Sequence, residues 1–218
     1  MTPHLTFHGV GRPGRPLEAG EAAVWVDADR FAALLDEVAE HHPEAVVTFD
    51  DGNASDHDVA LPALRERGLT ATFFVLAGRL DTAGSLSSDQ VRALVAEGMV
   101  VGSHGLSHRD WRTLDDAGLD EELVRARDVL EDVLGRPVRQ AACPFGSYDR
   151  RVLARLRGAG YERVFTSDGG HAPDGRWLTP RATVHAGDDV AWLRAALAPP
   201  GALATVRAGA KRWAKGLR

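Results

Sequence analysis

Short runs of apolar, often β-branched residues alternate along the chain with longer segments in which apolar residues recur every three or four positions. The runs have the length of strands, and the longer segments have the period of amphipathic helices. One apolar stripe runs from Phe31 to Val38, and Gly135 and Gly160 are placed to end two later helices. Seven runs predict strands, over residues 4–8, 45–49, 70–76, 99–103, 138–142, 163–166 and 178–184.

Strands that alternate with helices, and that are apolar on both faces, indicate a parallel sheet covered by its crossover helices. Because about seven such units follow one another, we expect the sheet to close, or nearly close, into a barrel, with an open doubly wound sheet as the alternative. We place this barrel domain over residues 1–198. The pattern breaks at the sequence Ala-Pro-Pro-Gly that ends at Gly201, and we predict a helix in the basic tail over 199–218.

The tail combines basic and apolar residues and carries no acidic one. Such a helix suits weak contact with an anionic membrane surface or with a phosphorylated partner. A solvated terminal helix that docks through its apolar residues explains the same pattern, and we favour it. The basic residues of the tail are Arg207, Lys211, Arg212, Lys215 and Arg218.

Composition narrows the classes of protein that fit. Of the 218 residues, 44% are hydrophobic and 26% charged, as in soluble globular proteins, and the net charge of −5 gives no overall basic field for nucleic acid. The single cysteine, Cys143, excludes an internal disulfide. The first residues lack the features of a signal peptide, and no apolar run approaches the ~20 residues that span a bilayer. We therefore expect a cytoplasmic protein without a nucleic-acid partner.

Two adjacent carboxylates directly follow one of the predicted strands. Asp50 and Asp51 come after the run at 45–49, and Gly52 follows them. A turn alone explains an Asp-Gly sequence, but two carboxylates at the edge of a buried strand are costly unless a cation or hydrogen-bond donors compensate them. Successive strand residues point to opposite sides, so both carboxylates face one site only if the backbone turns there, which Gly52 permits.

A pair of histidines follows another strand. His104 comes directly after the run at 99–103, and His108 stands four residues later. Strand ends gather at one face of a parallel barrel, where active sites lie. Two imidazoles and one carboxylate make a three-ligand set for a divalent transition metal that leaves positions open for water or substrate. At the next strand end, Pro144-Phe145-Gly146 is a stiff loop that offers an aromatic wall and a backbone N–H.

Together these residues resemble the polysaccharide deacetylase family, the carbohydrate esterases homologous to nodulation chitooligosaccharide deacetylases. The similarity covers about residues 4–185, which is most of the chain. Three motifs carry it in the family's order and spacing: Thr48-Phe49-Asp50-Asp51-Gly52, Ser103-His104-Gly105-Leu106-Ser107-His108 and Pro144-Phe145-Gly146.

The resemblance implies a distorted (β/α) barrel and a hydrolase that removes the N-acetyl group of an amino sugar. In the mechanism that the resemblance implies, a metal-bound water would attack the carbonyl while Asp50 takes its proton, and the N–H of Phe145 would help to hold the developing oxyanion. The implied cofactor is a divalent metal ion, with zinc favoured over cobalt, nickel, manganese and iron. Its implied ligands in this chain are Asp51, His104 and His108.

The chain departs from the family's pattern in three places. The family's third motif begins with an arginine that holds the base, and Ala142 stands at that position. We expect Arg181, on the last predicted strand, to supply the guanidinium instead. The fourth motif, Asp-x-x-Asp-Trp, is not visible. The fifth supplies the catalytic acid from Leu-x-x-His, and the chain keeps its histidine, His185, without the leucine. We predict His185 as the acid, with His8 and His171 as alternatives.

These features leave the substrate open. Without an export signal we expect one made inside the cell, such as a free, nucleotide-linked or lipid-linked amino sugar or another small amide, with Trp111 and Trp177 available to stack on a sugar ring. A cyclic amide or ureide hydrolase with the same metal site is an alternative. A catalytically decayed sugar- or metal-binding module is another; Ala142 favours it, whereas the retention of both Asp50 and Asp51 opposes it.

Overall fold

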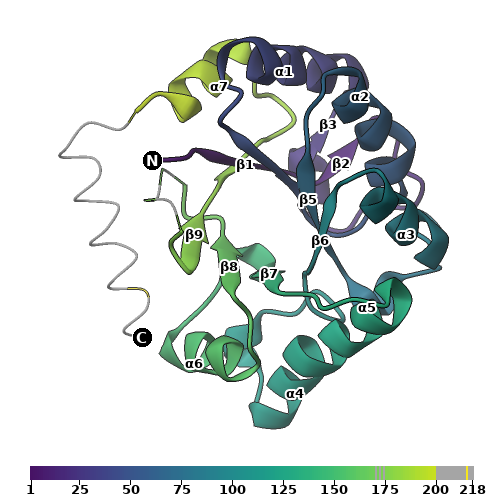
Figure 1. Cartoon of the computed structure of the whole chain (residues 1–218), viewed down its shortest axis with the longest axis vertical. Coiled ribbons are helices and arrows are strands. Elements are labelled where there is room, and N and C mark those ends of the chain that lie inside the picture. Colours follow the sequence, from purple (N-terminus) through teal and green to yellow (C-terminus); the bar gives the residue numbers. More distant parts are fainter. Residues whose placement is uncertain (170, 172, 174, 200–214, 216–218) are drawn as a thin grey trace.

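Parallel strands form a nearly closed barrel with helices around its outside in the computed structural model (Figure 1). The structure describes residues 1–169, 171, 173, 175–199 and 215. The sheet has eight strands in the order β10-β1-β4-β5-β6-β7-β8-β9, and every pairing in it is parallel. These strands are β1 (His4–Phe7), β4 (Val46–Phe49), β5 (Ala71–Val75), β6 (Val100–Ser103), β7 (Gln140–Ala142), β8 (Arg163–Thr166), β9 (Leu178–Pro180) and β10 (Ala182–Thr183).

The two edge strands of the sheet are consecutive in the chain, and only Arg181 separates them. β9 pairs with β8, while β10 pairs with β1 at the other edge. The N–H of Arg181 donates to the carbonyl of Thr166, and its own carbonyl accepts from Gly169. The run predicted at 178–184 therefore forms two strands, one at each edge of the sheet. The prediction of a barrel with about seven parallel strands is confirmed.

The helices follow the apolar stripes, and capping side chains mark where five of them begin, of which two serve as examples. Asp27 accepts hydrogen bonds from the first amides of α1 (Ala28–His41), and Ser87 forms a capping box at α3 (Ser88–Ala96). Gly135, with a φ of 63°, ends α5 (Ala126–Leu134). The remaining helices are α2 (Leu61–Glu66), α4 (Asp116–Asp120), α5 (Ala126–Leu134), α6 (Arg150–Gly158) and α7 (Val190–Leu197), and π-helical turns at 56–60 and 121–125 precede α2 and α5.

Side chains alternate between the two faces of the barrel wall. Phe7, Phe49 and Phe73 lie in register on neighbouring strands, and the rings of Phe49 and Phe73 stack at 4.7 Å. Phe31 of α1 packs edge-on against two of them, so this face forms the core between sheet and helices. Because successive strand residues point to opposite sides, the threonine that precedes each phenylalanine faces the barrel interior.

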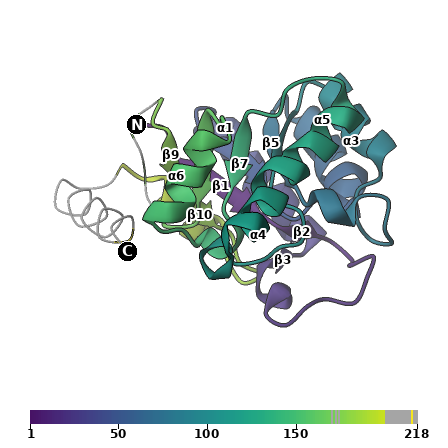
Figure 2. The same cartoon turned by 90° about the horizontal axis from the view of Figure 1, so that it is seen from below.

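A short second sheet lies beside the barrel and was not predicted from the sequence. β2 (Gly9–Val10) pairs with β3 (Trp25–Val26), and the ring of Trp25 covers Gly9 so closely that any Cβ there would overlap it. Between the two strands runs a segment of residues 11–24, which we call the wall segment and which ends in a 3-10 turn, Glu21–Val24. Figure 2 shows it in purple, projecting from one end of the barrel beyond β2 and β3.

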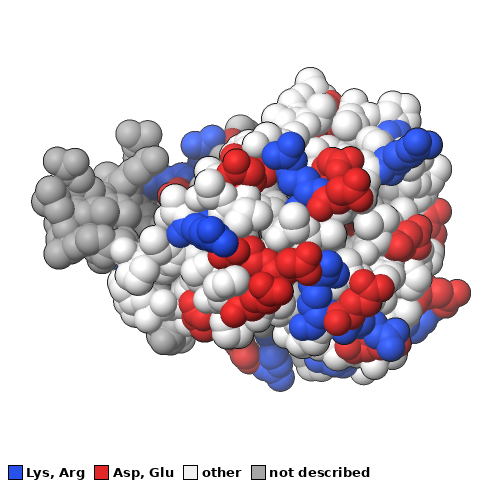
Figure 3. All heavy atoms as spheres, turned by 90° about the horizontal axis from the view of Figure 1, so that it is seen from above, with Lys and Arg blue, Asp and Glu red and all other residues white. Residues whose placement is uncertain are grey.

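Apart from Pro199 and Lys215, the predicted basic tail lies outside the described residues. The ammonium of Lys215 pairs with Asp168 at 2.8 Å and lies over the ring of Tyr148. No helix in the described part of the chain combines the length and the apolar character that crossing a membrane requires. Acidic and basic side chains are interspersed on the face shown in Figure 3.

Candidate active site

Three potential metal ligands meet at the carboxyl ends of β4 and β6. Oδ1 of Asp51 lies 3.5 Å from Nε2 of His104 and 3.5 Å from Nε2 of His108. This oxygen is buried and has no hydrogen-bond partner within the described residues. A buried carboxylate oxygen that faces two imidazole nitrogens, and that nothing else satisfies, fits a divalent metal ion. The structure therefore brings together the ligand set that the sequence predicts.

The backbone turns one residue earlier than we expected. Asp50, directly after β4, still continues the hydrogen bonding of the sheet, since its N–H donates to the carbonyl of Phe7. Asp51 itself has a φ of 78°, and Gly52 follows with 67°. Such values are uncommon for a residue with a Cβ, and Asp is one of the residues that tolerate them. The turn at Asp51 lets two adjacent carboxylates reach the same site.

A backbone carbonyl orients the imidazole of His104. Its Nδ1 lies 3.0 Å from the carbonyl oxygen of Ala142. Because a carbonyl only accepts, Nδ1 carries the proton and Nε2 presents its lone pair toward Asp51. Burial lowers the pKa of His104 to about 4, although Asp50 and Asp51 oppose the shift, so the ring is neutral at pH 7. A neutral imidazole with a free Nε2 is the form that binds a metal.

Arg181 reaches the neighbouring carboxylate from the junction of β9 and β10. Its Nη1 and Nη2 lie 2.7 Å from Oδ1 and Oδ2 of Asp50, and both side chains are buried. Nη1 also donates to the hydroxyls of Thr48 and Thr6, which face the barrel interior. Burial of Asp50 works against its ionisation, but Arg181 outweighs it and holds the pKa of Asp50 below its usual range. The guanidinium expected in place of Ala142 is thus in contact with Asp50.

The two carboxylates and two histidines open into one cavity of about 280 Å³. Phe145 stands at its rim with 64% of its surface exposed, and its ring lies 4.4 Å from that of His108. His8, which follows β1, also lines it, and Nδ1 of His8 is buried without a partner among the described residues. The lining residues are His8, Glu18, Ala19, Gly20, Glu21, Val24, Asp50, Asp51, His104, His108, Phe145 and Ser167.

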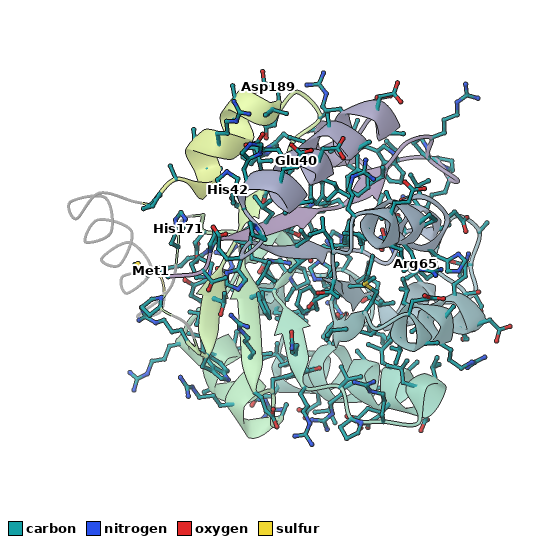
Figure 4. The ribbon with its side chains drawn as sticks, turned by 45° about the horizontal axis from the view of Figure 1, so that its top comes forward. Met1, Glu40, His42, Arg65, His171 and Asp189 are labelled. Atoms are coloured by element: carbon teal, nitrogen blue, oxygen red, sulfur yellow. The ribbon has the colours of Figure 1, made fainter. Side chains whose placement is uncertain are left out.

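The three histidines considered as the catalytic acid lie in different places. The side chain of His185 is 56% exposed, and its Nδ1 lies 3.4 Å from Asp188. His171 lies at the periphery in Figure 4, with Nε2 3.2 Å from the carbonyl of Leu197. Neither is among the described residues that line the cavity, whereas His8 is. The structure therefore brings His8, and not His185, next to Asp50 and the three ligands.

The wall segment forms one side of the cavity, a role that no pattern in the sequence indicated. Glu18 and Glu21 line the cavity from it. Arg15 pairs with Glu21 and donates to Oδ1 of Asn53 at 3.0 Å, which ties the segment to the turn after β4. Arg79, in the turn after β5, pairs with Glu18 of the same segment. The hydrogen bond of Arg15 to Asn53 and the ion pair of Arg79 with Glu18 therefore hold the segment beside the cavity.

Two aromatic residues proposed to stack on a sugar ring pack elsewhere. Trp111 is fully buried in a core cluster, and Trp177 packs against the same cluster and donates its Nε1–H to the carbonyl of Tyr161. Cys143 is also buried, and burial raises the pKa of its thiol to about 12, so it is not a nucleophile. Phe145 is therefore the aromatic side chain that the structure exposes at the cavity.

One buried acid near the site has no partner among the described residues. Asp56, in the π-helical turn at 56–60, is fully buried, and neither of its carboxylate oxygens accepts a hydrogen bond there. Burial raises its pKa well above the usual range, and the nearby Asp51 and Asp50 raise it further. Burial and the two neighbouring carboxylates therefore both oppose the ionisation of Asp56.

Comparison with known proteins agrees with the motifs. The family model described as polysaccharide deacetylase matches residues 37–164, more than half of the chain. A chitin deacetylase of Pestalotiopsis sp is 33% identical over 54% of this chain and 39% of its own. The chitooligosaccharide deacetylase of Rhizobium leguminosarum bv. trifolii is 29% identical over 61% of this chain and 60% of its own. The chain thus spans less than two thirds of the length of these curated relatives.

Solved structures share the barrel over most of the chain. A polysaccharide deacetylase from Bacillus cereus superposes with a TM-score of 0.77 at 21% identity, over 90% of this chain and 68% of its own. A Streptococcus pyogenes deacetylase, solved in complex with acetate, gives 0.78 at 20% identity, over 90% and 98%. At this sequence identity, the similarity to solved structures establishes the fold alone. Membership of the family is established by the family model. The chain belongs to the polysaccharide deacetylase family.

Proposed function

We propose that this chain is a metal-dependent hydrolase that removes the N-acetyl group from an amino sugar or an oligosaccharide of amino sugars. The observation that carries the proposal is the position of Asp50, an ionised carboxylate held by Arg181, in the same cavity as the three metal ligands. A module that only binds metal or sugar has no use for a base beside the ligands. The relatives described as chitin and chitooligosaccharide deacetylases support acetylated carbohydrates as substrates.

Asp50 is the proposed base. Asp51, His104 and His108 would hold a divalent ion, which would supply Lewis-acid polarisation and lower the pKa of a water molecule. Asp50 accepts the proton as the water oxygen attacks the acetyl carbonyl. The two hydrogen bonds from Arg181 fix the orientation of this carboxylate and keep it ionised in the free enzyme.

The loop after β7 offers the oxyanion contact. The amides of Gly146 and Ser147 already donate within the loop, to the carbonyls of Cys143 and Pro144. We therefore assign the contact to the N–H of Phe145, whose φ of 57° lies in the left-handed region. A backbone strained in this way is typical of a loop that its surroundings hold in one conformation. Removing an oxyanion donor of this kind costs about 3 kcal/mol of barrier in well-studied hydrolases.

His8 is the proposed catalytic acid, in place of His185. An amide nitrogen is a poor leaving group unless it is protonated as the C–N bond breaks. His8 lines the cavity, and its Nδ1 makes no hydrogen bond to any described residue that would occupy it. The side chain of His185 is instead half-exposed beside Asp188. His8 therefore lies where it can deliver the proton.

Acetate release tests the base and the substrate class together. The metal-loaded protein is assayed with N-acetylglucosamine, its nucleotide-linked form, chitin oligosaccharides, and a cyclic amide or ureide for ring opening. We expect acetate release from an amino-sugar substrate, and Asp50→Asn should lower kcat/KM by about 100- to 10,000-fold because proton transfer is lost. Ring opening without acetate release would favour the cyclic amide hydrolase, and sugar binding without turnover would favour the binding module.

A leaving group that needs no proton tests the acid. His8→Asn should lower kcat on the N-acetyl substrate by about 100-fold or more, and should leave hydrolysis of 4-nitrophenyl acetate nearly unchanged, because nitrophenolate leaves without protonation. His185→Asn is the matched control and should leave both rates near the wild-type values. The reverse pattern, with His185→Asn impaired only on the amide, would return the role to His185.

A further inference from the structure

One acidic side chain outside the cavity is buried against the loop that carries both histidine ligands. Glu122 is only 2% exposed. It lies in the π-helical turn Glu121–Arg125, between α4 and α5. In the part of the chain that the structure describes, no lysine, arginine or histidine pairs with it. A buried carboxylate without a cation has to be satisfied by neutral donors, and here those donors belong to the ligand loop.

Glu122 accepts hydrogen bonds from the residues between the two ligands. Oε2 lies 2.8 Å from the N–H of Leu106, and both oxygens lie 3.2 Å from the N–H of Ser107. The hydroxyl of Ser107 donates to Oε1 as well. His104 precedes these residues and His108 follows them, so the carboxylate holds the peptide groups that join one imidazole to the other.

The opposite side of the loop is fixed by backbone amides. The N–H of Ala77 donates to the carbonyl of Gly105, and the N–H of Gly78 donates to that of Leu106. At Gly105 the φ is 90°, and a Cβ would lie 2.5 Å from Oε2 of Glu122, so only glycine permits this close approach. The loop is thus held between two amides and one carboxylate, and a change in the carboxylate shifts the loop on that side.

The helix presents Glu122 inward because of its sequence and its local winding. Leu119, Leu123 and Ala126 are buried on the same face, at the three- and four-residue spacing of a helix, and Glu122 stands among them. π-helical turns are rare and frequently occur at functional sites. The sequence alone therefore shows that Glu122 is unusual, because an acidic residue stands where the helical pattern calls for an apolar one.

We propose that Glu122 is a positioning residue of the metal centre: by holding the amides of Leu106 and Ser107, it sets the relative placement of His104 and His108 and thereby strengthens divalent-metal binding. Partners of this kind behind metal ligands typically contribute about 10- to 100-fold in metal affinity. The inference rests on the metal site of the proposed function, and it does not depend on which substrate is hydrolysed.

Metal affinity is the measurement that tests it. The full chain is freed of metal with a chelator, and the Kd for Zn²⁺ is measured by competition with a chromophoric chelator. In Glu122→Gln the side-chain NH₂ faces donors that the carboxylate satisfied, so we expect the Kd to rise by about 10- to 100-fold. Glu121→Gln is the matched control, because Glu121 is half-exposed on the same turn and pairs with Arg125; its Kd should stay at the wild-type value.

A second measurement separates positioning from general stability. The absorption spectrum of bound Co²⁺ reports the arrangement of the ligands, and it should change in Glu122→Gln and not in Glu121→Gln. A role confined to folding would lower the thermal stability of the metal-free protein while leaving both Kd and spectrum unchanged, and that result would overturn the inference. An equal loss of affinity in Glu121→Gln would overturn it too.

Two further outcomes are decisive. If Glu122→Gln does not fold, Ser107→Ala removes one of the hydrogen bonds to Glu122, and an unchanged Zn²⁺ affinity in that variant would count against the inference, while weaker binding would support it. If the wild-type chain binds zinc but releases no acetate from any substrate, the proposed function fails and the role of Glu122 stands. If the wild type binds no divalent metal, both fail.

Discussion

Arg181 lies between the short strands β9 and β10 and contacts Asp50, the carboxylate that we propose as the base. Both side chains are buried, and the pair makes two parallel hydrogen bonds of 2.7 Å. Two threonine hydroxyls satisfy the guanidinium further. Removing one partner of a buried pair leaves the other charge uncompensated, which typically costs about 3–5 kcal/mol of stability. The pair therefore affects folding as well as catalysis.

Substituting Arg181 should move the pH dependence of the reaction. Arg181 holds the pKa of Asp50 below its usual range, whereas burial alone would raise it. In Arg181→Met the pKa of Asp50 should rise, so that the acid limb of the kcat/KM profile shifts to higher pH and activity near neutrality falls. The variant should also lose about 3–5 kcal/mol in the free energy of unfolding.

Arg181→Lys provides the comparison for this substitution. A lysine keeps the charge but loses the two-pronged geometry, so we expect it to restore most of the acid limb and only part of kcat. Rate profiles between pH 4 and 9, measured with urea unfolding on the same proteins, check both effects. An unchanged profile and rate in Arg181→Lys and Arg181→Met would show that Arg181 does not act on the base.

Among single residues, the metal ligands could be predicted from the sequence, whereas the catalytic acid could not. The convergence of parallel strand ends predicted that His104 and His108 lie near the two adjacent carboxylates, and the family resemblance identified Asp51 as the ligand among them. The choice of acid was not predictable, since several strands end in a histidine. Whether such a histidine faces the cavity or the solvent depends on the last turn of backbone, as His8 and His185 illustrate.

At the scale of elements, the short apolar runs predicted every strand of the barrel. Each of the seven runs contains a strand of the sheet, and the run at 178–184 contains two. The pattern missed β2 and β3 because a two-residue strand has no measurable alternation. It also missed the wall segment, because the contacts that place it beside the cavity join residues distant in sequence. They are the hydrogen bond of Arg15 to Asn53 and the ion pair of Arg79 with Glu18.

At the scale of the whole molecule, the core and the metal site are separate. The main apolar cluster lies between the barrel wall and its outer helices and contains Phe7, Phe49 and Phe73, and none of the three ligands belongs to it. The ligands sit where strands end, on loops whose backbone the barrel already fixes. A core of this extent buries enough apolar surface to fold without help, unlike the small domains that depend on zinc.

Metal removal should therefore leave the protein folded but less stable. The chelator-treated chain should keep a cooperative thermal transition, because the core is complete without the ion. Zn²⁺ added at about 100 times its Kd should stabilise the folded state by about 2.7 kcal/mol, which corresponds to a rise of roughly 5–10 °C in Tm for a chain of this size. Asp51→Asn removes the charged ligand and should abolish most of this rise, while its metal-free Tm stays close to that of the wild type.

Two outcomes would contradict this prediction. A metal-free protein without a thermal transition would mean that the ion holds the strand ends together. An equal rise in Asp51→Asn would mean that zinc binds elsewhere.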